Sequence, residues 1–204
     1  MPFLPVAALH DPATLAGALG AHGACLIRNF PDPIQTLNLR QSLDALRQAG
    51  ALNPAQVGHG VGQQRHTTIR GDDTAWLDAA SSIAEGEYLG ALQALRGQLN
   101  ESLYLGLQEE EAHFARYPPG AFYRKHRDQF HGTDTRILSL VSYLNQDWTD
   151  DDGGALRLYL ADGALDVFPR AGASIVFLSS LEHEVLPARR ERLSIAAWIR
   201  RRAP

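Results

Sequence analysis

The feature that most limits the fold of this chain is a change in hydrophobic periodicity near residue 110. Before it, apolar residues recur at the three- and four-residue spacing of helices. After it, short apolar or alternating runs such as RILSLVSYLN and GASIVFLS are separated by turns such as PPG, DDDGG and ADG. Closely spaced strands without intervening helices predict an antiparallel sandwich or jelly roll rather than a parallel sheet. We therefore expect an α+β, mainly β fold.

Three segments of the first half carry helix signals. HDPATLAGALGAHG (10–23) and FPDPIQTLNLRQSLDALRQAG (30–50) each contain an Asp–Pro pair, which supplies an N-cap and a proline at the first helical position. EGEYLGALQALRGQLNESLYLGL (85–107) spaces its leucines at helical intervals, and ACLIRNF (24–30) is a short strand candidate. The helices are expected to pack on one face of the strand-rich half as a buttress.

The chain is expected to form a single domain spanning residues 1–204. Residues 1–109 would be mainly helical support, and residues 110–204 would be the jelly-roll core. Residues 53–78 are long, glycine-rich and polar, and are predicted to be irregular. A loop of that length in a compact domain is usually functional or disordered.

Composition argues against several classes of protein. The formal net charge of −4 gives no bulk attraction to nucleic acid or to anionic membranes. The single cysteine, Cys25, cannot form an intramolecular disulfide, and no long apolar run or basic leader is present. We expect a cytoplasmic protein without a nucleic-acid or membrane partner; the sequence does not specify an oligomeric state.

A histidine and an aspartate stand two residues apart in YRKHRDQFHGTD (123–134). In a strand, residues i and i+2 face the same side, so His126 and Asp128 would present an imidazole and a carboxylate together. The pair alone is weak evidence, because an exposed polar strand end has the same pattern. His183, in the later run EHEV, could supply a third ligand at the open end of a jelly roll. Two histidines and one carboxylate form the facial triad that holds Fe(II).

Arg192, nine residues after His183, begins the last strand candidate, RLSIAAWIRR. A buried guanidinium matches the two oxygens of a carboxylate. The 2-oxoglutarate molecule has such a carboxylate at one end and an iron-chelating 2-oxo acid at the other. Two alternatives stay open: zinc in a cupin-like barrel, and an ordinary jelly roll in which both residues are structural.

Longer segments resemble a known family. RYPPGAFYRKHRD, SYLNQDW, GGALRLYL, HEVLPA and RLSIAAW are similar, in order and spacing, to the 2-oxoglutarate-dependent prolyl hydroxylases of the oxygen-sensing type (HIF prolyl hydroxylase-like), especially their short bacterial members. IRGDDTAWLD (69–78) is similar to the family's IRGDxxxW segment, which lies on a mobile loop over the active site. The resemblance implies a double-stranded β-helix (jelly roll) buttressed by N-terminal helices.

The family pattern implies roles for individual residues in cofactor binding. It assigns Fe(II) to His126, Asp128 and His183. It assigns the 2-oxoglutarate site to Arg192, Tyr143, Tyr117 and Leu156. O₂ would be the second cosubstrate, and the resemblance suggests ascorbate as the reductant.

The same pattern implies a substrate site made of Arg70, Asp72, Tyr123, Arg136 and Trp198. Arg136 would be the basic partner of Asp72. Core packing is the alternative for the aromatic residues. The region from Val57 to Trp76, with Gly58, Gly60, Gly62 and Gly71, would form a lid over the substrate.

Two positions depart from the family pattern. Ala196 replaces a threonine that often lines the cosubstrate pocket, and His113 replaces an apolar wall residue. His113 is otherwise interpreted, with the remaining histidines, as a structural or surface group.

The implied activity is hydroxylation of a prolyl residue in a protein, with release of succinate and CO₂. A translation factor such as elongation factor Tu is the target that bacterial relatives suggest. Three rivals remain: the same chemistry on a free amino acid or small molecule, a non-catalytic module that senses 2-oxoglutarate or metal, and a nucleic-acid demethylase. The last would need a basic groove, whereas basic residues concentrate in ARRER and IRRRAP.

Overall fold

The computed structural model describes residues 3–55, 68–129 and 135–202. In chain order its elements are β1 (Val6–Ala8), α1 (Pro12–His22), β2 (Ala24–Arg28), α2 (Pro33–Gln48), β3 (Asn53–Pro54), β4 (Asp73–Trp76), α3 (Ile83–Leu103), β5 (Glu109–Tyr117), β6 (Tyr123–His126), β7 (Arg136–Tyr143), a 3₁₀ turn (Asp150–Asp152), β8 (Leu156–Leu160), β9 (Gly163–Val167), β10 (Ala173–Leu178), β11 (His183–Val185) and β12 (Arg192–Arg200).

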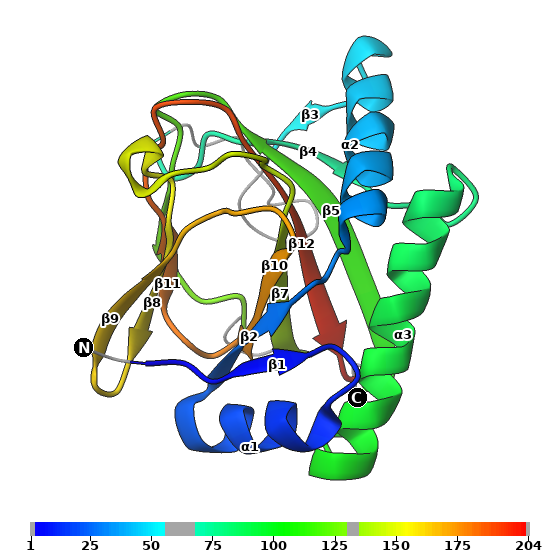
Figure 1. Ribbon diagram of the computed structural model, residues 1–204, viewed down its shortest axis with the longest axis vertical. Coiled ribbons are helices and arrows are strands. Elements are labelled where there is room, and N and C mark those ends of the chain that lie inside the picture. Colours follow the sequence, from blue (N-terminus) through cyan, green and yellow to red (C-terminus); the bar gives the residue numbers. More distant parts are fainter. Residues whose placement is uncertain (1–2, 56–67, 130–134, 203–204) are drawn as a thin grey trace.

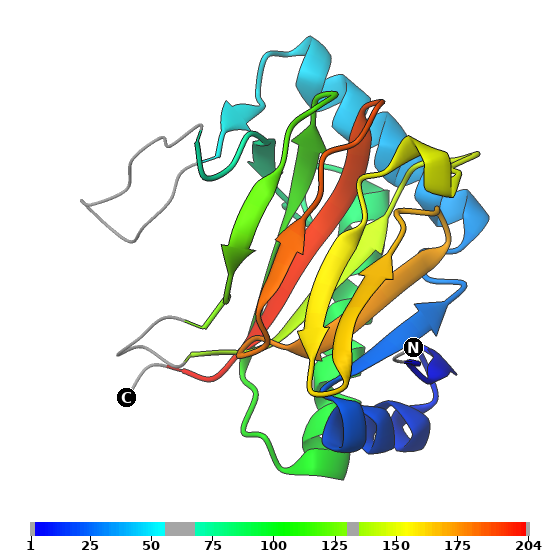
Figure 2. The same cartoon turned by 90° about the vertical axis from the view of Figure 1, so that its left-hand side faces the viewer.

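Within the described residues, the strands form two facing sheets (Figure 1). The large sheet has the order β1-β2-β10-β7-β12-β5-β4-β3, and the small sheet has the order β6-β11-β8-β9. Pairing is antiparallel except between β1 and β2, which are parallel. Seen from the side of the small sheet, its strands lie in front of the large sheet (Figure 2). This arrangement confirms the predicted jelly roll.

The three predicted helices are confirmed, together with two of the predicted caps. The Asp11 carboxylate accepts a hydrogen bond from the Thr14 backbone N–H at 3.1 Å, and Asp32 accepts one from the Gln35 N–H at 2.8 Å. The Ser82 hydroxyl caps α3. These side chains satisfy N–H groups that have no partner within the helix, so they fix where each helix begins.

The helices cover the outer face of the large sheet, as the buttress prediction requires (Figure 1). One apolar core lies between them and the sheet, and it includes Leu92, Leu95 and Leu99 of α3 with Ile195 and Ile199 of β12. A second apolar core lies between the two sheets. The large sheet is therefore packed on both faces, and none of the helices in the described residues is long and apolar enough to cross a membrane.

The prediction that residues 53–78 form one irregular loop is wrong for the part that the structure describes. Residues 69–71 pair with the edge of the small sheet: Arg124 N–H donates to the Ile69 carbonyl at 2.9 Å, and Gly71 N–H donates to the Phe122 carbonyl at 3.0 Å. β4 then pairs with β5 in the large sheet. Residues 69–76, hereafter the strap, thus connect the two sheets.

Part of the predicted lid cannot be compared with the structure. Residues 57–67, with Gly58, Gly60 and Gly62, lie outside the described residues. The described remainder is the strap, which is held by backbone hydrogen bonds at both ends.

We expect Leu92→Ala to lower the free energy of unfolding by about 2–5 kcal/mol, because Leu92 is fully buried in the helix–sheet core and its removal leaves a cavity. Urea unfolding followed by circular dichroism measures this. Gln93→Ala, at an exposed neighbouring position of α3, is the control and should change the value little. Equal small effects of both substitutions would contradict the buttress role of α3.

Candidate metal centre

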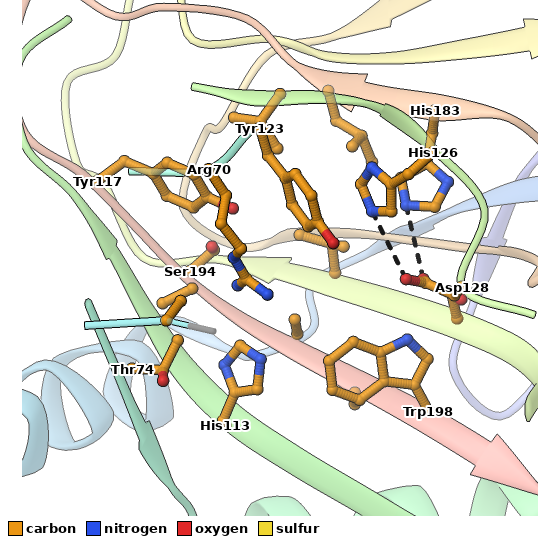
Figure 3. Close-up of a pocket in the computed structure, with 18 of the residues that line it drawn as sticks. Arg70, Thr74, His113, Tyr117, Tyr123, His126, Asp128, His183, Ser194 and Trp198 are labelled. Carbon is orange, nitrogen blue, oxygen red and sulfur yellow. Dashed lines mark hydrogen bonds and ion pairs between the residues drawn. The ribbon is translucent and has the colours of Figure 1, made fainter. Parts of the chain in front are cut away.

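Three side chains converge at one end of the space between the sheets (Figure 3). His126 ends β6, His183 begins β11, and the two residues are register partners. Asp128 lies in a bend beyond β6, so strand alternation does not place it beside His126. Instead, its backbone N–H donates to the Ser179 carbonyl at 3.1 Å. The candidate ligand atoms of the three residues lie within 4.8 Å of one another.

Backbone carbonyls orient both histidine rings. Nδ1 of His126 lies 2.7 Å from the Arg124 carbonyl oxygen, and Nδ1 of His183 lies 3.0 Å from that of Leu181. A carbonyl only accepts, so each Nδ1 donates its proton to the backbone and each Nε2 is the ring nitrogen that remains for a metal. Burial also lowers the pKa of His183. Both Nε2 atoms are thereby prepared as metal ligands.

The Asp128 carboxylate is buried but ionised. Burial alone would raise its pKa, but the imidazoles of His183 and His126 and a hydrogen bond from the Ser139 hydroxyl at 2.6 Å hold the pKa well below its ordinary value. Two imidazole nitrogens and one carboxylate oxygen, gathered at one side of a cavity, are the donor set that suits Fe(II) with open coordination positions.

A cavity of about 500 Å³ extends from these three residues between the sheets. Most of the other residues predicted for the site also line it: Arg70, Tyr117, Tyr123, Arg136, Leu156, Arg192 and Trp198. Tyr143 and Asp72 are buried directly behind this lining rather than in it. The structure therefore brings all twelve predicted site residues to one region.

At the other end of the cavity lies a guanidinium with an unused donor. Arg192 is 1% exposed; its Nε donates to the Gly154 carbonyl at 3.0 Å and its Nη1 to the Ser194 hydroxyl at 2.9 Å. Nη2 of Arg192 and the hydroxyl of Tyr143 are buried, and neither has a hydrogen-bond partner among the described residues. A buried charge of this kind is costly unless it is paired. The two unused groups fit the distal carboxylate of 2-oxoglutarate.

A glycine is required at position 154 for the hydrogen bond between the Gly154 carbonyl and Arg192. It has φ +68°, and a Cβ there would lie 2.8 Å from the Cβ of Ala188 and 3.5 Å from Cδ of Arg192. Only glycine lets the backbone carbonyl approach the guanidinium so closely.

The expected pairing of Asp72 with Arg136 is wrong for this structure. Arg70 holds the Asp72 carboxylate through two hydrogen bonds, of 2.8 and 2.6 Å. Arg136 donates to Glu111 instead, and its guanidinium carbon lies 3.7 Å from the centre of the Trp198 ring. Arg70 is two residues from Asp72 on the strap, so its fork meets the carboxylate without reaching across the cavity.

His113 lines the pocket, as its match to a wall position of the family pattern implied, although its spacing alone left it among the structural or surface histidines. It is 5% exposed and lines the cavity, with its ring centre 5.3 Å from that of Trp76 and 5.2 Å from that of Trp198. Burial lowers its pKa to about 4, so the imidazole is neutral at physiological pH. A signal existed: His113 and Tyr117 are four residues apart on β5 and share a face.

The jelly-roll fold, the metal cluster and the buried Arg192 are together characteristic of one class of protein. This class is the oxygenases that use Fe(II) and 2-oxoglutarate. In agreement, residues 112–200 match the family model of the 2OG-Fe(II) oxygenase superfamily.

Similarity to individual proteins identifies a family within this class of oxygenases. A *Pseudomonas putida* prolyl-4-hydroxylase structure is 44% identical, with a TM-score of 0.86, and the alignment covers 94% of this chain and 100% of that one. A *Trichoplax adhaerens* prolyl hydroxylase, solved with a peptide of the hypoxia inducible factor oxygen degradation domain, is 26% identical with a TM-score of 0.85, over 94% of this chain and 90% of that one. Human Egl nine homolog 1 is 28% identical over 88% of this chain and 44% of its own length.

The chain belongs to the prolyl hydroxylase family, and it is similar to members of the hypoxia-inducible-factor type. This confirms the resemblance found in the sequence. The chain spans about half the length of the mammalian relatives that it matches.

Anaerobic protein should bind Fe(II) and 2-oxoglutarate with a visible charge-transfer band, and His126→Ala or Asp128→Ala should abolish the band. Each substitution removes one of the three candidate ligands that the described residues bring together. Absorbance titration under argon measures this. His10→Ala, at an exposed position, should keep the full band. A full band in both site variants would rule out the triad.

Proposed function

We propose that this protein hydroxylates a prolyl residue of a protein substrate, using Fe(II), 2-oxoglutarate and O₂ and releasing succinate and CO₂. The observation that carries the proposal is a cavity lined by the His126–Asp128–His183 cluster and by Arg192, with the Tyr143 hydroxyl buried behind the lining; neither Arg192 Nη2 nor that hydroxyl has a hydrogen-bond partner among the described residues. The names of the relatives support the choice of proline as the target.

Iron and the cosubstrate's far carboxylate would be bound by two separate groups of side chains. His126, Asp128 and His183 would hold iron at one side and leave its other side facing the cavity. Bound Fe(II), with 2-oxoglutarate and O₂, would supply the oxidising chemistry. Arg192 and Tyr143 would fix the far carboxylate and so orient the 2-oxo acid end toward iron.

Apolar and aromatic side chains would keep water away from the reacting groups. Leu156 and Tyr117 are buried in the wall of the cavity that the iron ligands and Arg192 also line. Burial raises the pKa of the Tyr117 phenol, so that ring stays neutral. Exclusion of water strengthens the contact between the cosubstrate carboxylate and the guanidinium.

Tyr123 and Trp198 would receive the target proline. The Tyr123 ring stacks on the His126 ring with centres 3.6 Å apart, and the Arg70 guanidinium carbon lies 4.4 Å from the Tyr123 ring centre. Trp198 lines the cavity opposite the small sheet (Figure 3). Aromatic faces pack well against a proline ring and would present it beside the metal ligands.

A protein target fits better than the rivals considered from the sequence. The *T. adhaerens* relative was solved with a peptide, and it covers 94% of this chain. A translation factor such as elongation factor Tu is the candidate that the resemblance to short bacterial members favours, and the cytoplasm is the corresponding compartment. Mass spectrometry of the host proteome with and without this protein tests the proposal. A proline that gains the mass of one oxygen atom only when the protein is present would identify the target.

Arg192→Ala should raise the apparent 2-oxoglutarate requirement by about 100-fold or more while Fe(II) still binds. Truncation removes the charge that pairs with a desolvated carboxylate, and such losses amount to several kcal/mol. Steady-state kinetics and metal titration measure the two effects separately. Arg190→Ala, at an exposed neighbouring position, is the matched control. An unchanged Michaelis constant in Arg192→Ala would show that another basic residue binds the cosubstrate.

Asp72→Ala should cut hydroxylation of a protein substrate severely and leave uncoupled 2-oxoglutarate decarboxylation nearly intact. The Asp72 carboxylate holds Arg70 over Tyr123, whereas it contacts neither the iron ligands nor Arg192. Product assays for hydroxyproline and for CO₂ distinguish the two activities. Asp73→Ala, which removes an adjacent carboxylate paired with Arg116, is the control. Survival of both activities in Asp72→Ala would make a small-molecule substrate the better interpretation.

A further inference from the structure

Two buried serines surround the carboxylate of the metal cluster. Ser139, on β7, places its hydroxyl oxygen 2.6 Å from Oδ2 of Asp128 and 2.9 Å from the hydroxyl oxygen of Ser179. Ser139 is 1% exposed and Ser179 is fully buried. The Ser179 carbonyl also accepts the backbone N–H groups of Asp128 and Gln129, each at 3.1 Å. The bend that carries Asp128 is therefore fixed from the large sheet, whereas both histidines belong to the small sheet.

The direction of these hydrogen bonds follows from the first of them. The Ser139 hydroxyl has one proton and donates it to Oδ2 of Asp128. Ser139 then has only lone pairs to offer to Ser179, so the Ser179 hydroxyl must donate to Ser139. The order is Ser179 to Ser139 to Asp128. Hydrogen bonds to an ionised group in a buried site are short and strong, as the 2.6 Å distance indicates.

We propose that Ser139, oriented by Ser179, is a positioning residue that makes Asp128 bind iron through one oxygen only. The inference rests on the proposed function. Oδ2 accepts the Ser139 hydrogen bond, whereas Oδ1, which lies 3.6 Å from Nε2 of His126, does not, and Oδ1 is therefore the oxygen that we assign as the ligand. A carboxylate that bound through both oxygens would take one of the positions that a facial triad leaves for the 2-oxo acid and O₂. The serine pair thus keeps the coordination positions for the cosubstrates.

The same strand provides a matched control. Ser142 is also fully buried on β7, and its hydroxyl oxygen lies 2.6 Å from that of Ser174 and 2.8 Å from that of Tyr88. This second hydroxyl chain ends at the Phe30 carbonyl on the helix side of the sheet. It makes no hydrogen bond to the described residues of the metal cluster. Loss of Ser142 therefore reports the general cost of removing a buried hydroxyl from β7.

The experiment titrates Mn²⁺ into metal-free protein by calorimetry, and then titrates 2-oxoglutarate into the Mn²⁺-loaded protein. Ser139→Ala should weaken Mn²⁺ binding by about 10- to 100-fold, the usual effect of losing an outer hydrogen bond to a ligand. It should also weaken 2-oxoglutarate binding to the loaded protein, although Arg192 is unchanged. Ser139→Thr, which keeps a hydroxyl, should restore both affinities, and Ser179→Ala should show a smaller loss of each. Ser142→Ala should bind both as the wild type does.

Thermal unfolding of every variant separates positioning from stability. If Ser139→Ala does not fold, Ser139→Cys, which keeps the volume and is a weaker donor, should show an intermediate loss of Mn²⁺ affinity. Wild-type affinities in a folded variant without the hydroxyl would overturn the inference, as would equal losses in Ser142→Ala. Wild-type protein that bound no Mn²⁺ would contradict the proposed function itself, whatever the serine variants did.

Discussion

The register between β6 and β11 is the constraint on which the site depends. It places His126 directly opposite His183 at the edge of the small sheet. Because side chains alternate along a strand, a shift of one residue would turn one of these imidazoles to the other face. β11 is fixed on its other side by β8, with His183 opposite Leu158 and Val185 opposite Leu156. Pairing in the small sheet thus sets the position of the metal before any ligand binds.

The large sheet would set the position of the cosubstrate in the proposed function. Arg192 begins β12 opposite Tyr117, which ends β5, and Ser194 lies opposite Tyr143 on β7. The three strands are held by the helix core on one side and the inter-sheet core on the other. The distance from the proposed iron site to Arg192 is therefore set by the distance between the two sheets. Close packing of the core fixes that distance. A flexible cosubstrate would be held at both ends by groups that cannot approach each other.

Most of the fold could be predicted because its signals are local. Asp–Pro caps and alternating runs identify the helices and the longer strands, and the two histidines and Asp128 stand in recognisable patterns. β3 and β4 escaped prediction because they are short and because their pairing depends on a distant strand: β3 pairs with β4, and β4 pairs with β5, far along the chain. The partner that Asp72 has in this structure escaped prediction for a similar reason: Arg70 binds Asp72 and Glu111 binds Arg136, and these pairs form only in the folded chain. Serine at position 139 has no pattern that a sequence could reveal.

The strap gives the cavity a fixed rim at the point where a substrate would enter. Its first part belongs to the small sheet through β6, and its second part belongs to the large sheet through β5. Asp72, at the junction, is 3% exposed and paired with Arg70, and Arg70 covers the ring of Tyr123. A substrate that contacted Arg70 would therefore also affect the position of Tyr123. The Tyr123 ring stacks on that of His126, the candidate iron ligand. In the proposed function, one continuous stack of the Arg70, Tyr123 and His126 side chains would link substrate recognition to metal geometry.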